Sequence, residues 1–149
     1  MKLIEIHDRI YTRGHTHKLS SSDLLNALGN LRVTTIVNLT SRVDEPLRAA
    51  SGLVGVEYVC LPLVDNDKID RHGVYTAVET IVNVVESNHG VLVHCISGRN
   101  RTGLVVGIAV CHLTGLEPTE VLARLRERRP GLLTNETFQE YLLSGAWRS

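Results

Sequence analysis

The chain has 149 residues, of which 43% are hydrophobic and 21% charged, and its 16 basic side chains balance its 16 acidic ones. Zero net charge argues against a general nucleic-acid or membrane-surface binder, because both partners select an excess of basic residues. A chain of this length buries a substantial core without disulfides or metal. We therefore expect one domain over residues 1–149.

The three cysteines, Cys60, Cys95 and Cys111, are widely spaced and form neither a CxxC pair nor a Cys/His zinc pattern. We expect no disulfide framework, no metal and no other cofactor. The first ten residues are too charged for the apolar core of a signal peptide, and no apolar run has the length of a membrane span. These features favour a soluble, cytoplasmic protein in a reducing compartment, and they leave the oligomeric state open.

The N-terminal part of the chain combines short extended segments with a helix. Residues 3–6 and 9–12 alternate apolar with polar side chains, which predicts two strands. Ser20 to Ser22 can cap a following helix, which Gly29 can end. The apolar face of that helix consists of Leu24, Leu25 and Leu28.

Two apolar, β-branched segments come next. Residues 34–39 and 56–61 predict buried strands, and the second strand stops at Pro62. The segment between them is polar, with Pro46 near a helical turn. From 70 to 88, apolar residues recur at helical spacing and predict an amphipathic helix. Its apolar positions are Val74, Val78, Ile81, Val82 and Val85.

The C-terminal half completes an alternation of strands and helices. Residues 91–94 predict a strand, and 104–113 are apolar nearly all round, as in a helix buried through the centre of a domain. Pro118 suits the first turn of the next helix, and Thr134 or Asn135 can cap the last. The pattern implies an α/β fold of three layers, with a central, mostly parallel sheet flanked by helices. Such folds bind ligands outside the carboxyl ends of their strands.

One stretch carries the chemistry. VLVHCISGRNRTG, residues 91–103, reads as a strand, a polar loop and the start of a helix. Backbone N–H groups and a helix dipole converge at such a place, which binds an oxyanion and ionises a cysteine. An arginine six residues after a cysteine is a weak signal alone, and neither Cys60 nor Cys111 has one. The histidine before Cys95, the glycine three residues after it and the threonine after Arg101 make the pattern specific.

Each residue of this loop has a physical task in that interpretation. Cys95, as a thiolate, is the candidate nucleophile. Arg101 offers a planar fork that can hold two oxygens of a phosphoryl group. Gly98 allows close approach of the backbone and unusual backbone dihedral angles. Thr102 can donate its hydroxyl to the sulfur, and His94 can orient the loop.

Plainer interpretations stand beside these tasks. Cys95 can be read as a small buried hydrophobe. Cys60 and Cys111 have apolar neighbours and are expected in the core. His112 is expected to be a satisfied core or boundary histidine. Arg99 is either exposed charge or a residue that steers phosphate.

Transfer of a phosphoryl group to a thiolate needs an acid that protonates the departing oxygen. The segment LPLVDNDKID, which follows strand 56–61, supplies three carboxylates. Asp65 is the first candidate, because it directly follows the strand and lies at the same sheet edge as Cys95 if the strands are parallel. Asp67 is the second candidate, whereas Asp70 suits the N-cap of the following helix.

The loop and its flanks resemble the cysteine-dependent protein tyrosine phosphatase superfamily, and within it the small dual-specificity phosphatases. HCISGRNRT matches their HCxxGxxR[ST] signature, and IVNLTSR, YVCLPLVD and RERRPGLLTNETFQEYL resemble stretches that these enzymes carry in the same order. The resemblance implies a protein tyrosine phosphatase-like fold and hydrolysis of phosphomonoesters through a phosphocysteine intermediate. It implies Cys95 as nucleophile, Arg101 as the phosphate-binding arginine and Asp65 as general acid. It also implies that Thr102 assists turnover. The implied phosphate-binding residues are Ile96, Ser97, Gly98, Arg99, Asn100 and Arg101.

Departures from the larger tyrosine-specific relatives bear on the substrate. Those enzymes place their acid in a Trp-Pro-Asp loop and deepen the pocket with a further loop, but the only tryptophan here is Trp147. A shallower pocket implies phosphoserine and phosphothreonine as well as phosphotyrosine in protein substrates. Those relatives also use a glutamine near the water of the second step, in the region where Thr134 or Asn135 falls here.

Three alternative functions share the loop. GRNRTG also resembles the loop of cysteine-dependent RNA 5′-triphosphatases, although the chain is neutral and shows no evident basic stripe. A phosphoinositide phosphatase is a further alternative, although such loops usually carry additional lysines. A binding-only pseudophosphatase is the least favoured, because the nucleophile, the arginine and the acid are all present.

Overall fold

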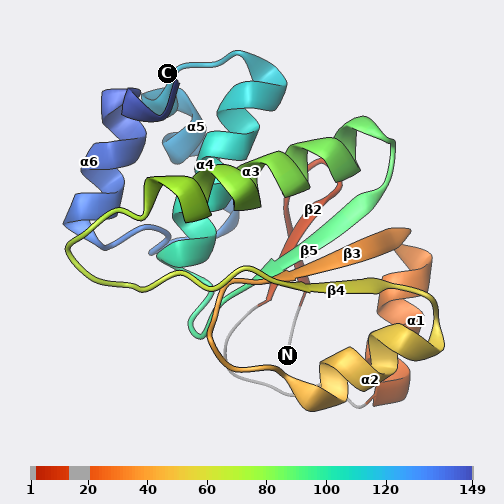
Figure 1. The fold of residues 1–149 in the computed structure, drawn as a ribbon. Coiled ribbons are helices and arrows are strands. Elements are labelled where there is room, and N and C mark those ends of the chain that lie inside the picture. Colours follow the sequence, from red (N-terminus) through yellow and green to blue (C-terminus); the bar gives the residue numbers. More distant parts are fainter. Residues whose placement is uncertain (1–2, 14–20, 149) are drawn as a thin grey trace.

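The computed structural model describes residues 3–13 and 21–148, and it places helices on both sides of one sheet (Figure 1). In chain order the elements are β1 (Leu3–His7), β2 (Ile10–Arg13), α1 (Ser21–Asn30), β3 (Val33–Asn38), α2 (Glu45–Leu53), β4 (Glu57–Cys60), α3 (Arg71–Glu86), β5 (Gly90–His94), α4 (Arg101–Thr114), α5 (Pro118–Arg128), α6 (Glu136–Ser144) and the short helix η1 (Ala146–Arg148). Each predicted strand begins and ends within one residue of the corresponding observed strand.

The described strands form one sheet in the order β1-β2-β5-β3-β4. β1 pairs with β2 in antiparallel register, whereas the pairs β2–β5, β5–β3 and β3–β4 are parallel. The predicted α/β class with a mostly parallel sheet is therefore confirmed. Because β3, β4 and β5 run in one direction, the loops that leave them gather at one edge of the sheet.

The sheet is the middle of three layers. α1 and α2 cover one face, α3 and α4 cover the other, and α5 and α6 pack around α4 (Figure 1). On β5, Val91 and Val93 belong to the core beneath α3 and α4, while Leu92 belongs to the core beneath α1 and α2. A strand buried on both faces needs apolar side chains at successive positions, which explains the continuous apolar run before His94.

α4 is the central helix. Its residues 102–111 are all buried, as the apolar run predicted. Gly107 lets α6 approach closely, because a Cβ atom there would lie 3.0 Å from Cδ2 of Leu142. No single described helix is long and apolar enough to cross a bilayer, and the one pair with enough length and apolar character together, α4 and α5, bends by 119°.

Two local predictions needed correction. The polar segment around Pro46 forms the full helix α2, because the Asp44 carboxylate accepts a hydrogen bond from the Leu47 N–H (3.1 Å) and the proline occupies the first turn. Gly29 does not end α1, which continues to Asn30. Ser20, the first of the predicted capping serines, lies outside the described residues.

Candidate active site

Three loops meet at the carboxyl edge of the sheet, one after each of β3, β4 and β5. We call residues 95–101, after β5, the Cys95 loop and residues 61–70, after β4, the Asp65 loop. The loop after β3 begins at Leu39. The Leu39 N–H donates to the carbonyl of His94, and the Leu63 N–H donates to the carbonyl of Leu39, both at 2.9 Å. These main-chain bonds hold the Asp65 loop beside the Cys95 loop, so the two predicted parts of the site lie at one edge.

Cys95 lies at the first turn of α4. The hydroxyl of Thr102 donates a hydrogen bond to the Cys95 sulfur at 3.1 Å. Since Thr102 is the second residue of α4, the sulfur sits at the positive end of the helix dipole. Cys95 is 8% exposed, but its neighbour Ile96 is 75% exposed, so the loop reaches the surface within one residue. The sulfur therefore has an oriented hydrogen-bond donor and lies at a helix N-terminus, surroundings that a thiol that merely fills space would not need.

The Arg101 guanidinium combines one hydrogen bond to the main chain with an N–H donor that has no partner among the described residues. Its Nη1 donates to the carbonyl of Leu63 at 3.2 Å, which ties the Cys95 loop to the Asp65 loop. Its Nε is buried and has no hydrogen-bond partner among the described residues. A buried cationic donor without an acceptor costs free energy, and an incoming oxyanion removes that cost. The guanidinium therefore keeps a donor that could bind an anion at this edge of the sheet.

Gly98 gives the Cys95 loop its shape. Its φ of 68° lies in the left-handed region, which residues with a side chain rarely adopt. A Cβ atom there would lie 2.7 Å from the carbonyl oxygen of Arg13, which is main chain and has little room to move. The glycine predicted to permit close backbone approach is thus required by both conformation and space.

Arg129 supports the Cys95 loop through a hydrogen bond, and the sequence did not predict this role. Its Nη2 donates to the carbonyl of Ser97 at 2.7 Å, and the residue is only 8% exposed. Burial lowers the pKa of Arg129, the charge of Arg99 lowers it further, and Cys95 opposes both effects. In the sequence Arg129 stands in RERRPG, among arginines that read as ordinary charge at a helix end. Only packing distinguishes it from them.

His94 supports the loop as a neutral imidazole. It is 4% exposed, and burial lowers its pKa to about 4, helped by the nearby Arg13 charge. Asp44 and a main-chain hydrogen bond with Cys95 oppose this shift. Arg13 and Asp44 form an ion pair at 2.7 Å. Burial alone raises the pKa of Asp44, but hydrogen bonds from Arg13 and the Leu47 N–H outweigh it, so the net shift is downward.

The Asp65 side chain is hydrogen-bonded to the Cys95 loop. Its Oδ2 accepts from the Asn100 amide at 3.1 Å, and its Oδ1 accepts from the Asn135 amide at 2.7 Å. Asp70 caps α3 by accepting from the Gly73 N–H, as predicted. Asp67 is exposed two residues beyond Asp65. Of the two candidates for the acid, Asp65 is the one that the described hydrogen bonds join to the loop.

The remaining cysteines and His112 differ in their surroundings. Cys111 is buried, as expected, and burial raises its pKa to about 11. The prediction that Cys60 lies in the core is wrong: it is exposed, because β4 is the edge strand of the sheet. His112 is also exposed and packs edge-on against Trp147 with ring centroids 5.3 Å apart, so it is a boundary histidine.

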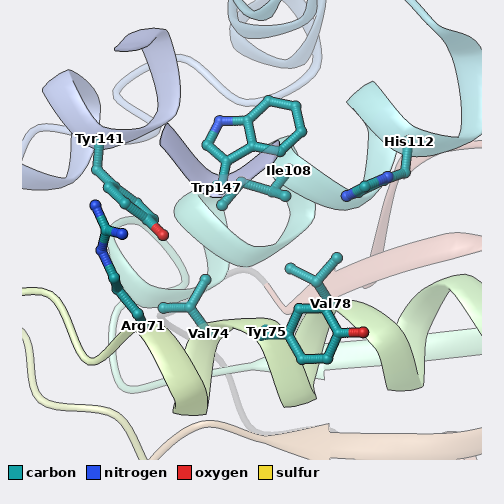
Figure 2. A pocket seen from close by; sticks show the side chains of 8 residues that line it. All are labelled: Arg71, Val74, Tyr75, Val78, Ile108, His112, Tyr141 and Trp147. Carbon is teal, nitrogen blue, oxygen red and sulfur yellow. The ribbon is translucent and has the colours of Figure 1, made fainter. Parts of the chain in front are cut away.

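A small pocket of about 20 Å³ lies away from Cys95, between α3 and the helices α4, α6 and η1 (Figure 2). An adjoining, more open hollow of about 250 Å³ shares its residues Arg71, Tyr75, Tyr141 and Trp147. The Arg71 guanidinium stacks over the Tyr141 ring at 5.6 Å. Neither space includes a residue of the Cys95 loop. Among the described residues no group of three or more His, Cys, Asp or Glu side chains is arranged to hold a metal ion.

A cysteine delivered by a strand, an arginine at the start of the next helix and a tight loop between them define the class of cysteine-dependent phosphatases. The family described as "Dual specificity phosphatase, catalytic domain" matches residues 17–146. The chain belongs to this family. The predicted resemblance is thereby confirmed.

Relatives and solved structures agree with this assignment. Mpk3 of Drosophila melanogaster, a dual specificity protein phosphatase, is 25% identical over 87% of the chain, and human dual specificity protein phosphatase 15 is 26% identical over 84%. The chain spans only 30% and 41% of the lengths of these two curated relatives. The crystal structure of human DUSP28 shares the fold, with a TM-score of 0.77 and 18% identity over 95% of this chain and 90% of that one.

Replacing Gly98 with alanine tests the shape of the loop. Gly115→Ala is the matched control, because Gly115 has a similar φ of 72° but open space around it. The control should lose about 1–2 kcal/mol in the free energy of unfolding, the cost of a left-handed alanine. Gly98→Ala should lose about 2 kcal/mol more, because its methyl group meets the Arg13 carbonyl. Equal losses in urea unfolding would contradict the steric account.

The buried neutral His94 predicts a loss of stability in acid. The unfolded chain binds a proton at this histidine more readily than the folded protein does. The free energy of unfolding is therefore highest above a pH of about 6.5 and falls as the pH is lowered toward about 4. This one group should account for about 2 kcal/mol of the difference in unfolding free energy between about pH 7 and about pH 5. His94→Asn should show a difference smaller by that amount. An unchanged pH dependence in the variant would refute the assignment.

Proposed function

We propose that the chain hydrolyses phosphomonoesters, namely phosphotyrosine and phosphoserine or phosphothreonine in proteins, through a phosphocysteine intermediate. The observation that carries the proposal is the Thr102 hydroxyl 3.1 Å from the Cys95 sulfur, together with a buried Arg101 Nε that has no partner among the described residues and belongs to the same loop. Together these supply a prepared nucleophile and a prepared anion holder. Membership of the dual specificity phosphatase family supports the same chemistry.

In the first step the Cys95 thiolate attacks the phosphorus atom, an S–P bond forms and the bond to the ester oxygen breaks. Arg101 and the main-chain N–H groups of the Cys95 loop, residues 96–101, hold the phosphoryl oxygens as negative charge shifts among them. Asp65 gives its proton to the departing oxygen, so that the product leaves as a neutral alcohol or phenol. His94 positions the main chain at Cys95, Arg129 holds the carbonyl of Ser97, and neither contacts the reacting atoms.

In the second step water replaces sulfur on the phosphorus. Asp65, now a carboxylate, takes a proton from the water as the oxygen attacks. The S–P bond breaks, and the electron pair returns to Cys95 as a thiolate. The Thr102 hydroxyl stabilises this leaving sulfur through the hydrogen bond it already makes. Inorganic phosphate leaves and the starting enzyme is restored without a metal or cofactor in either step.

The surface around the site supports a broad substrate range. Ile96, directly after the nucleophile, and Val64, directly before the acid, are both exposed hydrophobic residues. They offer apolar contact to whatever carries the phosphate. Within the Cys95 loop Arg99 is the one exposed cationic side chain, and a single exposed charge is a weak basis for selecting a polyanion such as a multiply phosphorylated inositol or a triphosphate-ended RNA. We therefore favour phosphoproteins over those two substrates. We propose residues 1–149 as a single catalytic domain that works in the cytoplasm.

The nucleophile is tested with a generic aryl phosphate in the presence of EDTA. The wild type should turn over, and Cys95→Ser should lose activity by at least about a thousandfold, because a serine hydroxyl is not ionised at neutral pH. Cys60→Ser is the control, since this exposed thiol has no part in the scheme. Activity that persists in Cys95→Ser, or that EDTA abolishes in the wild type, would sink the proposal.

The acid is tested by comparing Asp65→Asn with Asp67→Asn. Loss of a general acid should lower kcat/KM for phenyl phosphate about a hundredfold or more in Asp65→Asn. Asp67→Asn should stay within about twofold of the wild type, because Asp67 is not joined to the Cys95 loop. Steady-state kinetics of the two variants decides between them. The reverse pattern would make Asp67 the acid.

A further inference from the structure

The Asn100 side chain joins the Cys95 loop to two distant segments. Its Oδ1 accepts hydrogen bonds from the N–H groups of Thr134 (2.8 Å) and Asn135 (2.9 Å), and also from the Thr134 hydroxyl at 3.2 Å. Its Nδ2 donates to Asp65 at 3.1 Å. The orientation of this amide is unambiguous, since the reverse would set its NH₂ group against three donors and its oxygen against a carboxylate.

The Asp65 carboxylate is held on both of its oxygens. Asn100 donates to Oδ2, and Asn135 donates to Oδ1. The Asn135 amide also donates to the Asn66 carbonyl at 2.8 Å, and its oxygen caps α6 by accepting from the Phe138 N–H at 3.1 Å. Asn135 therefore keeps partners of its own if Asp65 moves away. The Nδ2 of Asn100 has Asp65 as the acceptor that the structure gives it.

The turn before Asn135 is held in an unfavourable backbone conformation. Leu133 is buried and has a φ of 63°, in the left-handed region where a leucine is strained. Its N–H donates to the carbonyl of Arg99 at 3.1 Å, and the Asn100 oxygen binds the next two N–H groups. The Cys95 loop thus anchors the turn that delivers the second amide to Asp65.

We propose that Asn100 is a positioning residue that aims Asp65 at the leaving oxygen. The inference rests on the proposed function, in which Asp65 is the acid and base. Asp65 is exposed on a loop, and without a fixed partner its carboxylate would sample many orientations. Asn100 is the residue before Arg101, so the side chain that orients the acid and the side chain that holds the phosphate move together. In this role the Asn100 amide keeps its hydrogen bond to Oδ2 of Asp65. The Asn135 amide gives up its bond to Oδ1, which then carries the proton.

Two aryl phosphates test this role. Phenyl phosphate has a poor leaving group that needs a proton, whereas 2,4-dinitrophenyl phosphate has a good one that does not. The readout is the ratio of kcat/KM for the first substrate to that for the second, because kcat/KM reports formation of the phosphocysteine. A change that only weakens phosphate binding lowers both values and leaves the ratio unchanged.

The decisive variant is Asn100→Asp. It keeps an oxygen that accepts from Thr134 and Asn135, so the turn stays anchored, but it replaces the amide donor to Asp65 with a second carboxylate. The ratio should fall at least fivefold in Asn100→Asp and in Asn100→Ala. Asn66→Ala, which keeps its main-chain carbonyl and lies on the same loop, is the control and should keep the wild-type ratio. Urea unfolding of each variant checks that it is folded.

Coupling to the acid is tested with the double variant. Asp65→Asn should lower the ratio further than Asn100→Asp does, and the combination should be no worse than Asp65→Asn alone, because Asn100 acts through Asp65. A wild-type ratio in Asn100→Asp, or losses that multiply in the double variant, would overturn the positioning role while leaving the phosphatase assignment intact.

A wild-type ratio in Asp65→Asn would instead overturn the acid assignment and the positioning role with it. A wild type without Cys95-dependent turnover would overturn the proposed function itself.

Discussion

The hydrogen bond from the Thr102 hydroxyl to the Cys95 sulfur fixes the thiol against the first turn of α4. The bond needs the end of β5 and the start of α4 to be rigid, since Cys95 directly follows β5 and Thr102 lies in the first turn of α4. Both elements are buried through most of their length, which gives them that rigidity. The three layers of the fold therefore serve to hold one strand end and one helix start at a fixed separation.

A second constraint brings the acid to the nucleophile. The bonds from Leu39 to His94, from Leu63 to Leu39 and from Arg101 to Leu63 connect the three loops at the carboxyl edge. Each involves main chain at one or both ends, so side-chain changes in the Asp65 loop leave the connection in place. Parallel β3, β4 and β5 make this arrangement possible, because only parallel strands send successive loops to one edge.

Much of this was predictable from the sequence, and the remainder was not for identifiable reasons. The Cys95 loop could be predicted because its strand, loop and helix start are adjacent in the chain. Arg129 could not be assigned to the site, since only the packing at the end of α5 carries it there. The resemblance placed Thr134 or Asn135 near the site, but the hydrogen bond from Asn135 to Asp65 depends on the tertiary contacts of α6. The exposure of Cys60 was also missed, because its apolar neighbours look like core and the order of strands in the sheet decides which one is the edge. Short-range spacing thus predicts the nucleophile, whereas its supports depend on tertiary contacts.

The most direct test of the account is to locate the phosphate on the enzyme during turnover. Rapid denaturation of the protein after mixing with an aryl phosphate, followed by digestion and mass spectrometry, maps any phosphorylated residue. The account predicts phosphate on the peptide that contains Cys95, in a form absent from Cys95→Ser, and none on peptides containing Cys60 or Cys111. Phosphate on another residue, or turnover with no phosphorylated enzyme at any mixing time, would contradict it.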